Sequence, residues 1–171
     1  MKKHFVKTKT LVTIALLIAL TIVIARFLSI QTPIIRISLS FIPTALCSML
    51  FGPVAGAVSA FLSDFLGMLI NSKGMAYFIG FGISEALYGL TYGLFLYKRP
   101  KNFLPIILCV VLQMIVIDIG LGSLWANMTA GTPFLAVLGT RSVRALIMVP
   151  IKVFGIKYIW ETVGKRLNTT L

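Results

Sequence analysis

The chain has 171 residues, of which 58% are hydrophobic and only 12% are charged. Soluble domains average about 45–50% apolar and about 25% charged residues, so this composition excludes an ordinary soluble domain and indicates an integral membrane protein. The net charge of +12 would suggest a nucleic-acid partner in a soluble protein, but in a membrane protein basic residues flanking the spans explain it. We therefore expect contact with membrane lipid and no nucleic acid.

The first part of the chain is predicted to form three spans. One apolar stretch, 37–70, is too long for a single span, because about 34 helical residues would reach about 51 Å across a hydrocarbon core of about 30 Å. Proline disfavours helix in the residue before it, so Gly52 and Pro53 are expected to break the stretch. The predicted spans are 9–28, 38–51 and 54–70, with a polar loop at 29–36.

The rest of the chain is predicted to form three more spans. They cover 78–97, 103–124 and 140–160, and the loops between spans are 71–77, 98–102 and a semi-polar segment at 126–139. Apolar runs of 18 or more residues are typical of transmembrane helices. The sequence thus predicts one domain, residues 1–171, that is all-α and has six transmembrane helices.

Basic residues indicate the orientation of this predicted bundle. With six spans, both termini and the loop 98–102 lie on one side, and loops rich in Lys and Arg favour the cytoplasmic side. We therefore expect a multi-pass protein of the cell membrane with both termini in the cytoplasm. The residues on that side are Lys2, Lys3, Lys7, Lys9, Lys98, Arg99, Lys101, Lys157, Lys165 and Arg166.

Every acid inside a predicted span falls in the outer half of that span, and five basic residues lie at or near the same level. An ionised side chain at the membrane centre costs roughly 2.5–3.5 kcal/mol, so it usually faces a cavity or a charged partner. Structural ion pairs between helices would explain any one of these residues, but their shared depth favours a polar cavity open to the outer side. They are Arg26, Arg36, Asp64, Lys73, Glu85, Asp118, Arg141 and Arg144, with Asn71 at the same level.

Small residues form stripes at helical spacing, which predicts close helix packing. One stripe is Gly56, Ala60, Asp64 and Gly67, and another is Gly82, Ala86, Gly89 and Gly93. Ala15 and Ala19 form a similar pair in the first span. Arg26 has nearly the same azimuth as Ala15 but lies about 16 Å further along the helix, so the two can face different partners only if the helix bends or tilts.

Several kinds of chemistry have no motif in this chain. The sequence contains no phosphate-binding G-x-x-x-x-G-K-[ST] loop, no H-E-x-x-H and no G-x-S-x-G, so it predicts neither an ATPase nor a hydrolase. Its one histidine, His4, lies in the basic N-terminus, so no metal site is expected. Cys47 and Cys109 lie in apolar segments, where we expect small core residues and no disulfide.

Four segments resemble a known family. RISLSFIP (36–43), LFGPVAGAVSAFLSD (50–64), GFGISEALYGLTYGLFLYKR (80–99) and LGTRSVRALIMVPIKV (138–153) are similar to the folate-specific substrate-binding (S) subunits of energy-coupling factor (ECF) vitamin transporters. The resemblance implies a protein that is not an enzyme, needs no cofactor and binds its vitamin with high affinity from outside. It implies a partner module with one membrane scaffold protein and two ATPases that use ATP. It also implies that Ala15 and Ala19 contact the scaffold and that the loop 29–37 acts as a gate.

The chemistry of folate matches several residues of the predicted outer side. A pterin edge presents an amide N–H beside an amino group, and one carboxylate, which we expect to be Asp64, accepts both hydrogen bonds. The glutamyl tail carries two carboxylates, and the arginine fork binds such groups well. The predicted tail-binding residues are Arg26, Arg36 and Arg144, and the predicted aromatic walls are Phe27, Tyr77, Phe81 and Trp125.

A second set of polar residues is predicted to surround this site. It consists of Glu85, Asp118, Arg141, Asn71 and Lys73. For Glu85 and Asp118 two roles stay open, because each either meets the ligand or pairs with Arg141 or Arg144 and holds it in position.

Three alternatives to a folate-binding subunit stay open at this point. The first is an S subunit for another vitamin, such as riboflavin. The second is a small proton-coupled carrier that uses Asp64, Glu85 and Asp118, which would accumulate substrate with a pH gradient and no partner. The third is a structural membrane subunit, which has no ligand.

Overall fold

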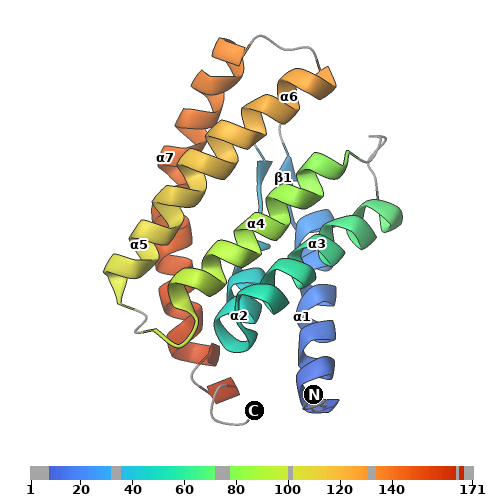
Figure 1. The fold of residues 1–171 in the computed structure, drawn as a ribbon, viewed down its shortest axis with the longest axis vertical. Helices are drawn as coiled ribbons and strands as arrows, with labels where there is room; N and C mark the ends of the chain where they lie inside the picture. The colour runs from blue at the N-terminus through green and yellow to red at the C-terminus, as the bar shows by residue number, and fades with distance from the viewer. Residues whose placement is uncertain are drawn as a thin grey trace, which may run out of the picture.

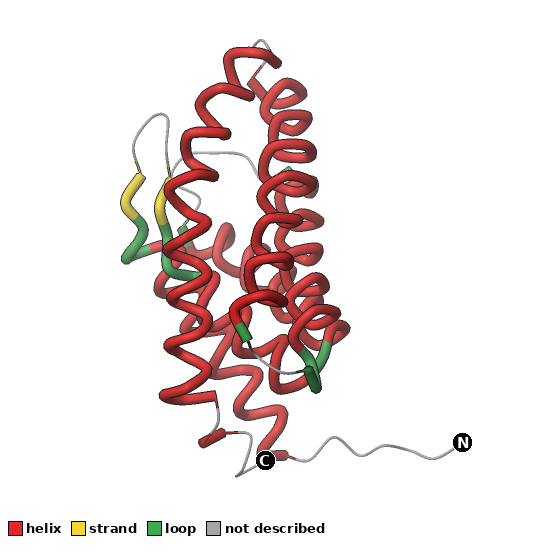
Figure 2. The backbone as a smooth tube through the Cα atoms, turned by 90° about the vertical axis from the view of Figure 1, so that its left-hand side faces the viewer, coloured by secondary structure: helices red, strands yellow, loops and turns green. Residues whose placement is uncertain are grey.

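The computed structural model describes residues 8–31, 36–71, 78–99, 102–130, 134–164 and 166–167. Over these residues the chain forms a bundle of six helical runs with one small antiparallel ribbon at its side (Figures 1 and 2). The elements are α1 (Thr8–Arg26), β1 (Ile30–Gln31), β2 (Arg36–Ile37), α2 (Phe41–Phe51), α3 (Pro53–Ile70), α4 (Ile79–Leu96), α5 (Phe103–Leu112), η1 (Gln113–Leu121), α6 (Gly122–Ala130), α7 (Phe134–Ile159) and η2 (Trp160–Gly164).

The six predicted helices are all present. In the described part of the chain, four helical runs are long and apolar enough to cross a membrane, namely α1, α3, α4 and the continuous run formed by α5, the π-helical segment η1 and α6. α2 has 11 residues, or about 16 Å of helix, and so reaches across only about half of a hydrocarbon core. α7 has 26 residues. α1 begins and η2 ends at the same end of the bundle (Figure 1).

The predicted break at Gly52 and Pro53 is confirmed. Gly52 has φ of +95°, a conformation that side chains disfavour and glycine adopts freely. Pro53 is the first residue of α3, where its missing N–H costs no helical hydrogen bond. Pro43 likewise lies in the first turn of α2, which explains why that helix begins at Phe41 and is not kinked further on.

The predicted loops differ from the structure in two places. The prediction of a loop at 126–139 is wrong, because α6 continues to Ala130 and α7 begins at Phe134. The polar residues there do not stop the helix, since Thr129 Oγ1 donates to the Trp125 carbonyl, 2.7 Å away, within the same helix. In the predicted loop 29–36, β1 and β2 pair as a ribbon with Ile30 opposite Ile37.

Close packing of α3 on α4 follows the predicted glycine stripes. A Cβ atom added to Gly89 would collide with the backbone of Gly56, and one added to Gly93 would collide with Pro53. The two helix backbones therefore approach as closely as glycine permits. The apolar core lies beside this crossing, between α2, α4, α5 and α7. Cys47 and Cys109 are buried in it and free, as predicted.

The burial of α1 changes along its length. Ala15 and Ala19 are exposed, whereas Arg26 is buried at the helix end. α3 crosses only the part of α1 that leads to Arg26 (Figure 1). Residues of one azimuth can therefore be uncovered near the start of α1 and buried near its end, without the bend that the sequence analysis called for.

Candidate ligand-binding site

Arg26 and Asp64 form an ion pair between α1 and α3. Arg26 Nη2 donates to Asp64 Oδ1 at 3.1 Å and to the Asp64 carbonyl at 3.2 Å, and its Nη1 contacts the Met68 sulfur at 3.2 Å. The side chains are 4% and 17% exposed. Gly67 makes room for this arrangement, because a Cβ atom there would lie 2.7 Å from Arg26 Nε. Gly67, the last residue of this stripe, thus makes room for the guanidinium.

A second charge cluster joins η1 to α7. Asp118 Oδ1 accepts hydrogen bonds from Arg141 Nη1 at 3.3 Å and Arg144 Nη1 at 3.2 Å. Arg141 also donates to the Asp118 carbonyl at 3.0 Å. Arg141 packs on Gly122, where a Cβ atom would collide with it. This cluster holds one carboxylate and two guanidinium groups, so it carries a net positive charge.

Aromatic side chains connect α4 to α6. Phe78 makes edge contacts with Phe81 and Trp125, with ring centroids 5.7 and 5.5 Å apart. Trp125 Nε1 donates to Ser84 Oγ at 3.0 Å. Gly80 is needed here, since a Cβ atom would collide with Phe78. The prediction named Phe81 and Trp125 but missed Phe78, which its position three residues before Phe81 would have indicated.

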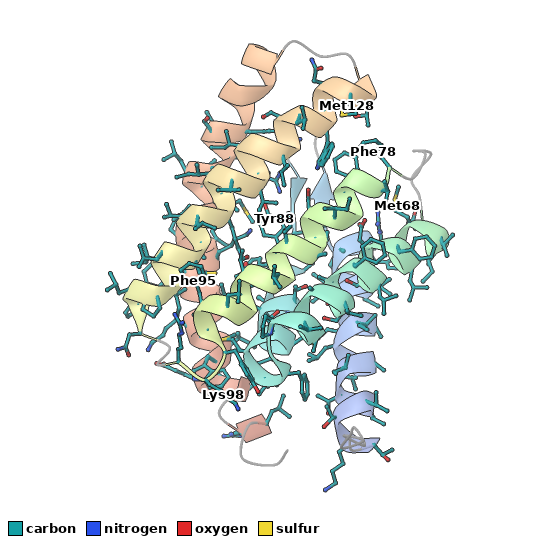
Figure 3. All side chains as sticks on the ribbon, viewed as in Figure 1. Met68, Phe78, Tyr88, Phe95, Lys98 and Met128 are labelled. Carbon is teal, nitrogen blue, oxygen red and sulfur yellow. The ribbon has the colours of Figure 1, made fainter. Side chains whose placement is uncertain are left out.

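Figure 3 relates these groups along the bundle. Phe78 lies toward one end, Met68 and Tyr88 lie at a similar level nearer the middle, and Lys98 lies at the end where α1 begins. The Arg26 pair beside Met68 and the aromatic group at Phe78 therefore both lie well away from the end that carries Lys98.

A buried lysine was also missed. The side chain of Lys152 on α7 is buried, and its Nζ lies 4.5 Å from the centroid of the Tyr88 ring and 5.9 Å from that of Phe41. Across the described residues it forms no ion pair. The sequence did carry a signal, because an ionisable residue within a predicted span is by default a candidate functional residue.

The remaining predicted site residues belong to neither charge cluster. Phe27 is 63% exposed and Phe81 is 40% exposed, and Glu85 is exposed on α4. Asn71 directly follows α3. Arg36 belongs to β2, but its side chain lies outside the described part of the structure, as do Lys73 and Tyr77. Among the described residues no group of His, Cys, Asp and Glu is arranged to hold a metal ion.

Together these features define a helical membrane protein with buried charge clusters, which is the kind of protein that binds a polar solute within a membrane. The family model described as ECF transporter, substrate-specific component, matches residues 9–159. The chain belongs to this family, which confirms the predicted resemblance and identifies it as a transporter component that is not an enzyme.

Relatives and solved structures agree with this assignment. The chain is 36% identical to folate transporter FolT of Clostridium novyi, over 93% of this chain and 92% of that one. It is 32% identical to folate transporter FolT of Leuconostoc mesenteroides, over 88% and 83%. A crystal structure of FolT bound with folic acid superposes with a TM-score of 0.83 at 33% identity, over 89% and 92%. The S component of another bacterial ECF transporter, at 23% identity over 96% and 98%, shares the fold with a TM-score of 0.57.

Proposed function

We propose that this chain is the high-affinity folate-binding S component of an ECF-type vitamin importer. The observation that carries the proposal is the likeness, over most of the chain, to relatives named as folate transporters and to a FolT structure that holds folic acid. On this proposal the chain binds folate from outside and delivers it through a module of one scaffold protein and two ATPases.

The Arg26–Asp64 pair suits the pterin end of folate. Asp64 is a carboxylate in a largely buried position, where hydrogen bonds from an amide N–H and an amino group replace those that water would otherwise supply. Arg26 holds Oδ1 from one side and so fixes the orientation of the carboxylate. The sequence analysis assigned Arg26 to the glutamate tail. In the structure Arg26 contacts Asp64, so on this proposal it lies beside the pterin ring and away from the tail. We therefore propose that Arg26 positions Asp64.

The Asp118 cluster suits the glutamate end. Asp118 neutralises only one of the two arginines that it holds, and the spare positive charge favours a ligand with carboxylates. Arg144 Nε is buried and makes no hydrogen bond within the described part of the structure. Such an atom is costly unless a partner arrives. We propose Arg144 as a tail contact, with Arg141 and Asp118 holding it, and Arg36 as a further tail contact.

The flat rings of folate require apolar walls. Trp125 is fixed by its hydrogen bond to Ser84 and by the edge of Phe78, so its ring is already oriented for stacking. We propose Trp125 and Phe81 as ring contacts, with Phe27 and Tyr77 completing the walls. Glu85, Asn71 and Lys73 are proposed as outer polar neighbours of the site.

The proposed membrane arrangement follows the basic residues. The two described ends of the chain and Lys98 share one end of the bundle (Figures 1 and 3), which supports cytoplasmic termini and a cavity open to the outer side. Ala15 and Ala19 are exposed on α1, which supports a scaffold contact there. The loop 29–37, which contains the ribbon, is proposed as the gate.

The direct test is titration calorimetry of the purified protein in detergent against folate, riboflavin, thiamine and biotin, each alone. We expect sub-micromolar binding of folate and no heat from the others. Binding of another vitamin would keep the family and discard folate as its ligand. Heat from none of them, with the protein shown to be folded, would contradict a vitamin-binding role.

A further inference from the structure

Lys152 is an ammonium group in the protein interior that the proposed site does not use. It lies on α7, and its side chain is buried. Its Nζ faces the ring of Tyr88 on α4 and the ring of Phe41 on α2. A charged lysine is almost never fully buried unless it is paired. Within the described part of the chain its partners are aromatic faces, not carboxylates.

The helices that carry the rings around Lys152 are packed against their neighbours. Phe41 packs against α7 at Gly155, where a Cβ atom would lie 3.2 Å from the ring. The carbonyl of Tyr88 accepts a hydrogen bond from Gln113 Nε2 at 3.2 Å. Lys152 thus lies where α2, α4 and α7 meet, and cation–π attraction to the two rings holds its ammonium there.

The charged groups whose fields act on Lys152 are Asp118, Glu85 and Arg144. Lysine side chains on a helix point toward the helix N-terminus, so Lys152 extends along α7 toward the turns that carry Arg141 and Arg144. The three basic side chains of this face outnumber the two acids near them. These five groups together therefore carry a net positive charge.

We propose that Lys152 is a specificity-determining residue, whose buried positive charge, held on the face of Tyr88, selects ligands that carry negative charge. This inference rests on the proposed function and deepens it. Lys152 acts on the two carboxylates of folate through space and adds to the direct contacts of Arg144. A buried charge is screened little by salt, so its effect reaches across the site.

The test compares folate with its α,γ-diamide, which has the same shape and rings but no carboxylate. The affinity of each is measured by calorimetry in detergent for the wild type, Lys152→Met and the charge-conserving Lys152→Arg. We expect Lys152→Met to bind folate about tenfold more weakly and the diamide unchanged, the size expected for one unit charge over about 10 Å at an effective dielectric constant of about 20. Lys152→Arg should restore most of the loss.

Each other result has a definite meaning. Equal losses for folate and the diamide would show a purely structural role, and no loss for either would show that the charge is irrelevant. Both results overturn the inference. A wild type that does not bind folate would instead overturn the proposed function. If Lys152→Met does not fold, Lys152→Gln, which keeps a polar end, answers the same question.

Tyr88 gives an independent check with a matched control. Tyr88→Phe keeps the ring face and should keep the preference for folate over the diamide. Tyr88→Leu removes the face that holds the ammonium, and it should narrow that preference about threefold, a shift within the range of one cation–π contact. An unchanged preference in Tyr88→Leu would contradict the role given to the ring.

Discussion

The two charge clusters use the same ion-pair chemistry with different charge balance. Arg26 and Asp64 are matched one to one between α1 and α3. Asp118 is shared by Arg141 and Arg144, and Lys152 lies further along the same helix. The first cluster is neutral and offers a carboxylate edge, whereas the second keeps positive charge. Folate has a neutral hydrogen-bonding ring at one end and carboxylates at the other, and we propose that each cluster binds one of these ends.

The largest effect should come from removing the acid of the second cluster. Asp118→Ala leaves two partly buried arginines without this counter-charge, and removing one partner of a buried pair costs up to about 3–5 kcal/mol of stability. Thermal unfolding in detergent should show a marked loss. The matched control is Glu161→Ala, which breaks the exposed pair with Lys157 and should cost less than about 1 kcal/mol. Equal losses for the two variants would show that the second cluster has no structural role.

Removing the acid of the first cluster should act on binding. Asp64→Ala should weaken folate by about 1.5–3 kcal/mol, or about 10- to 150-fold, because charge-assisted hydrogen bonds are lost. Asp64→Asn keeps the shape of the side chain and removes its charge, so it measures the effect of the charge alone. Calorimetry with folate measures both. If Asp64→Ala binds folate as tightly as the wild type, the assignment of the pterin end is wrong.

The next prediction concerns the close packing of α4 on α3, the helix that carries Asp64. Gly89→Ala places a methyl group against the Gly56 backbone, and overpacking of this kind costs about 1–3 kcal/mol. Gly139→Ala is the matched control, since its Cβ atom meets nothing within 4 Å and alanine favours helix. The measurement is the melting temperature of each variant in detergent, and we expect a lower value for Gly89→Ala than for Gly139→Ala. A Gly89 variant as stable as the Gly139 variant would mean that the backbones are not in close contact.

The smallest effect should come from the aromatic group that joins α4 to α6. Trp125→Phe removes the hydrogen bond to Ser84 and should cost about 0.5–1.5 kcal/mol. Ser84→Ala should have a similar effect, and the double variant should lose little more than either single change. Additive losses in a double-mutant cycle of unfolding would rule out the bond.

Sequence reasoning succeeded where a local rule acts. Gly52 and Pro53 break the helix by backbone sterics, and the stripes containing Gly56 and Gly89 predict a close crossing. It failed where the outcome depends on three-dimensional context. The residues around Trp125 are compatible with either loop or helix, and tertiary packing makes them helical.

The site residues also divide into features that the sequence predicts and features that depend on three-dimensional context. Depth along the helices placed Arg26, Asp64, Asp118 and Arg144 at one level, but depth does not say which acid pairs with which base. That depends on helix neighbours and azimuth, so the sequence alone does not predict the contact between Arg26 and Asp64. The sequence did not predict Lys152 as a site residue, because a basic residue past the middle of the last span is also compatible with the membrane flank.

The central claim is that the first cluster binds the pterin ring and the second binds the glutamate. The most direct test compares the binding of folate with that of pteroate, which ends at the benzoate and lacks the glutamate. Calorimetry of Arg144→Met and Asp64→Asn with both ligands measures the preference of each variant. The account predicts that Arg144→Met loses affinity for folate and keeps its affinity for pteroate, while Asp64→Asn weakens both by the same factor. Equal losses of both ligands in Arg144→Met would contradict the claim that the second cluster binds the glutamate.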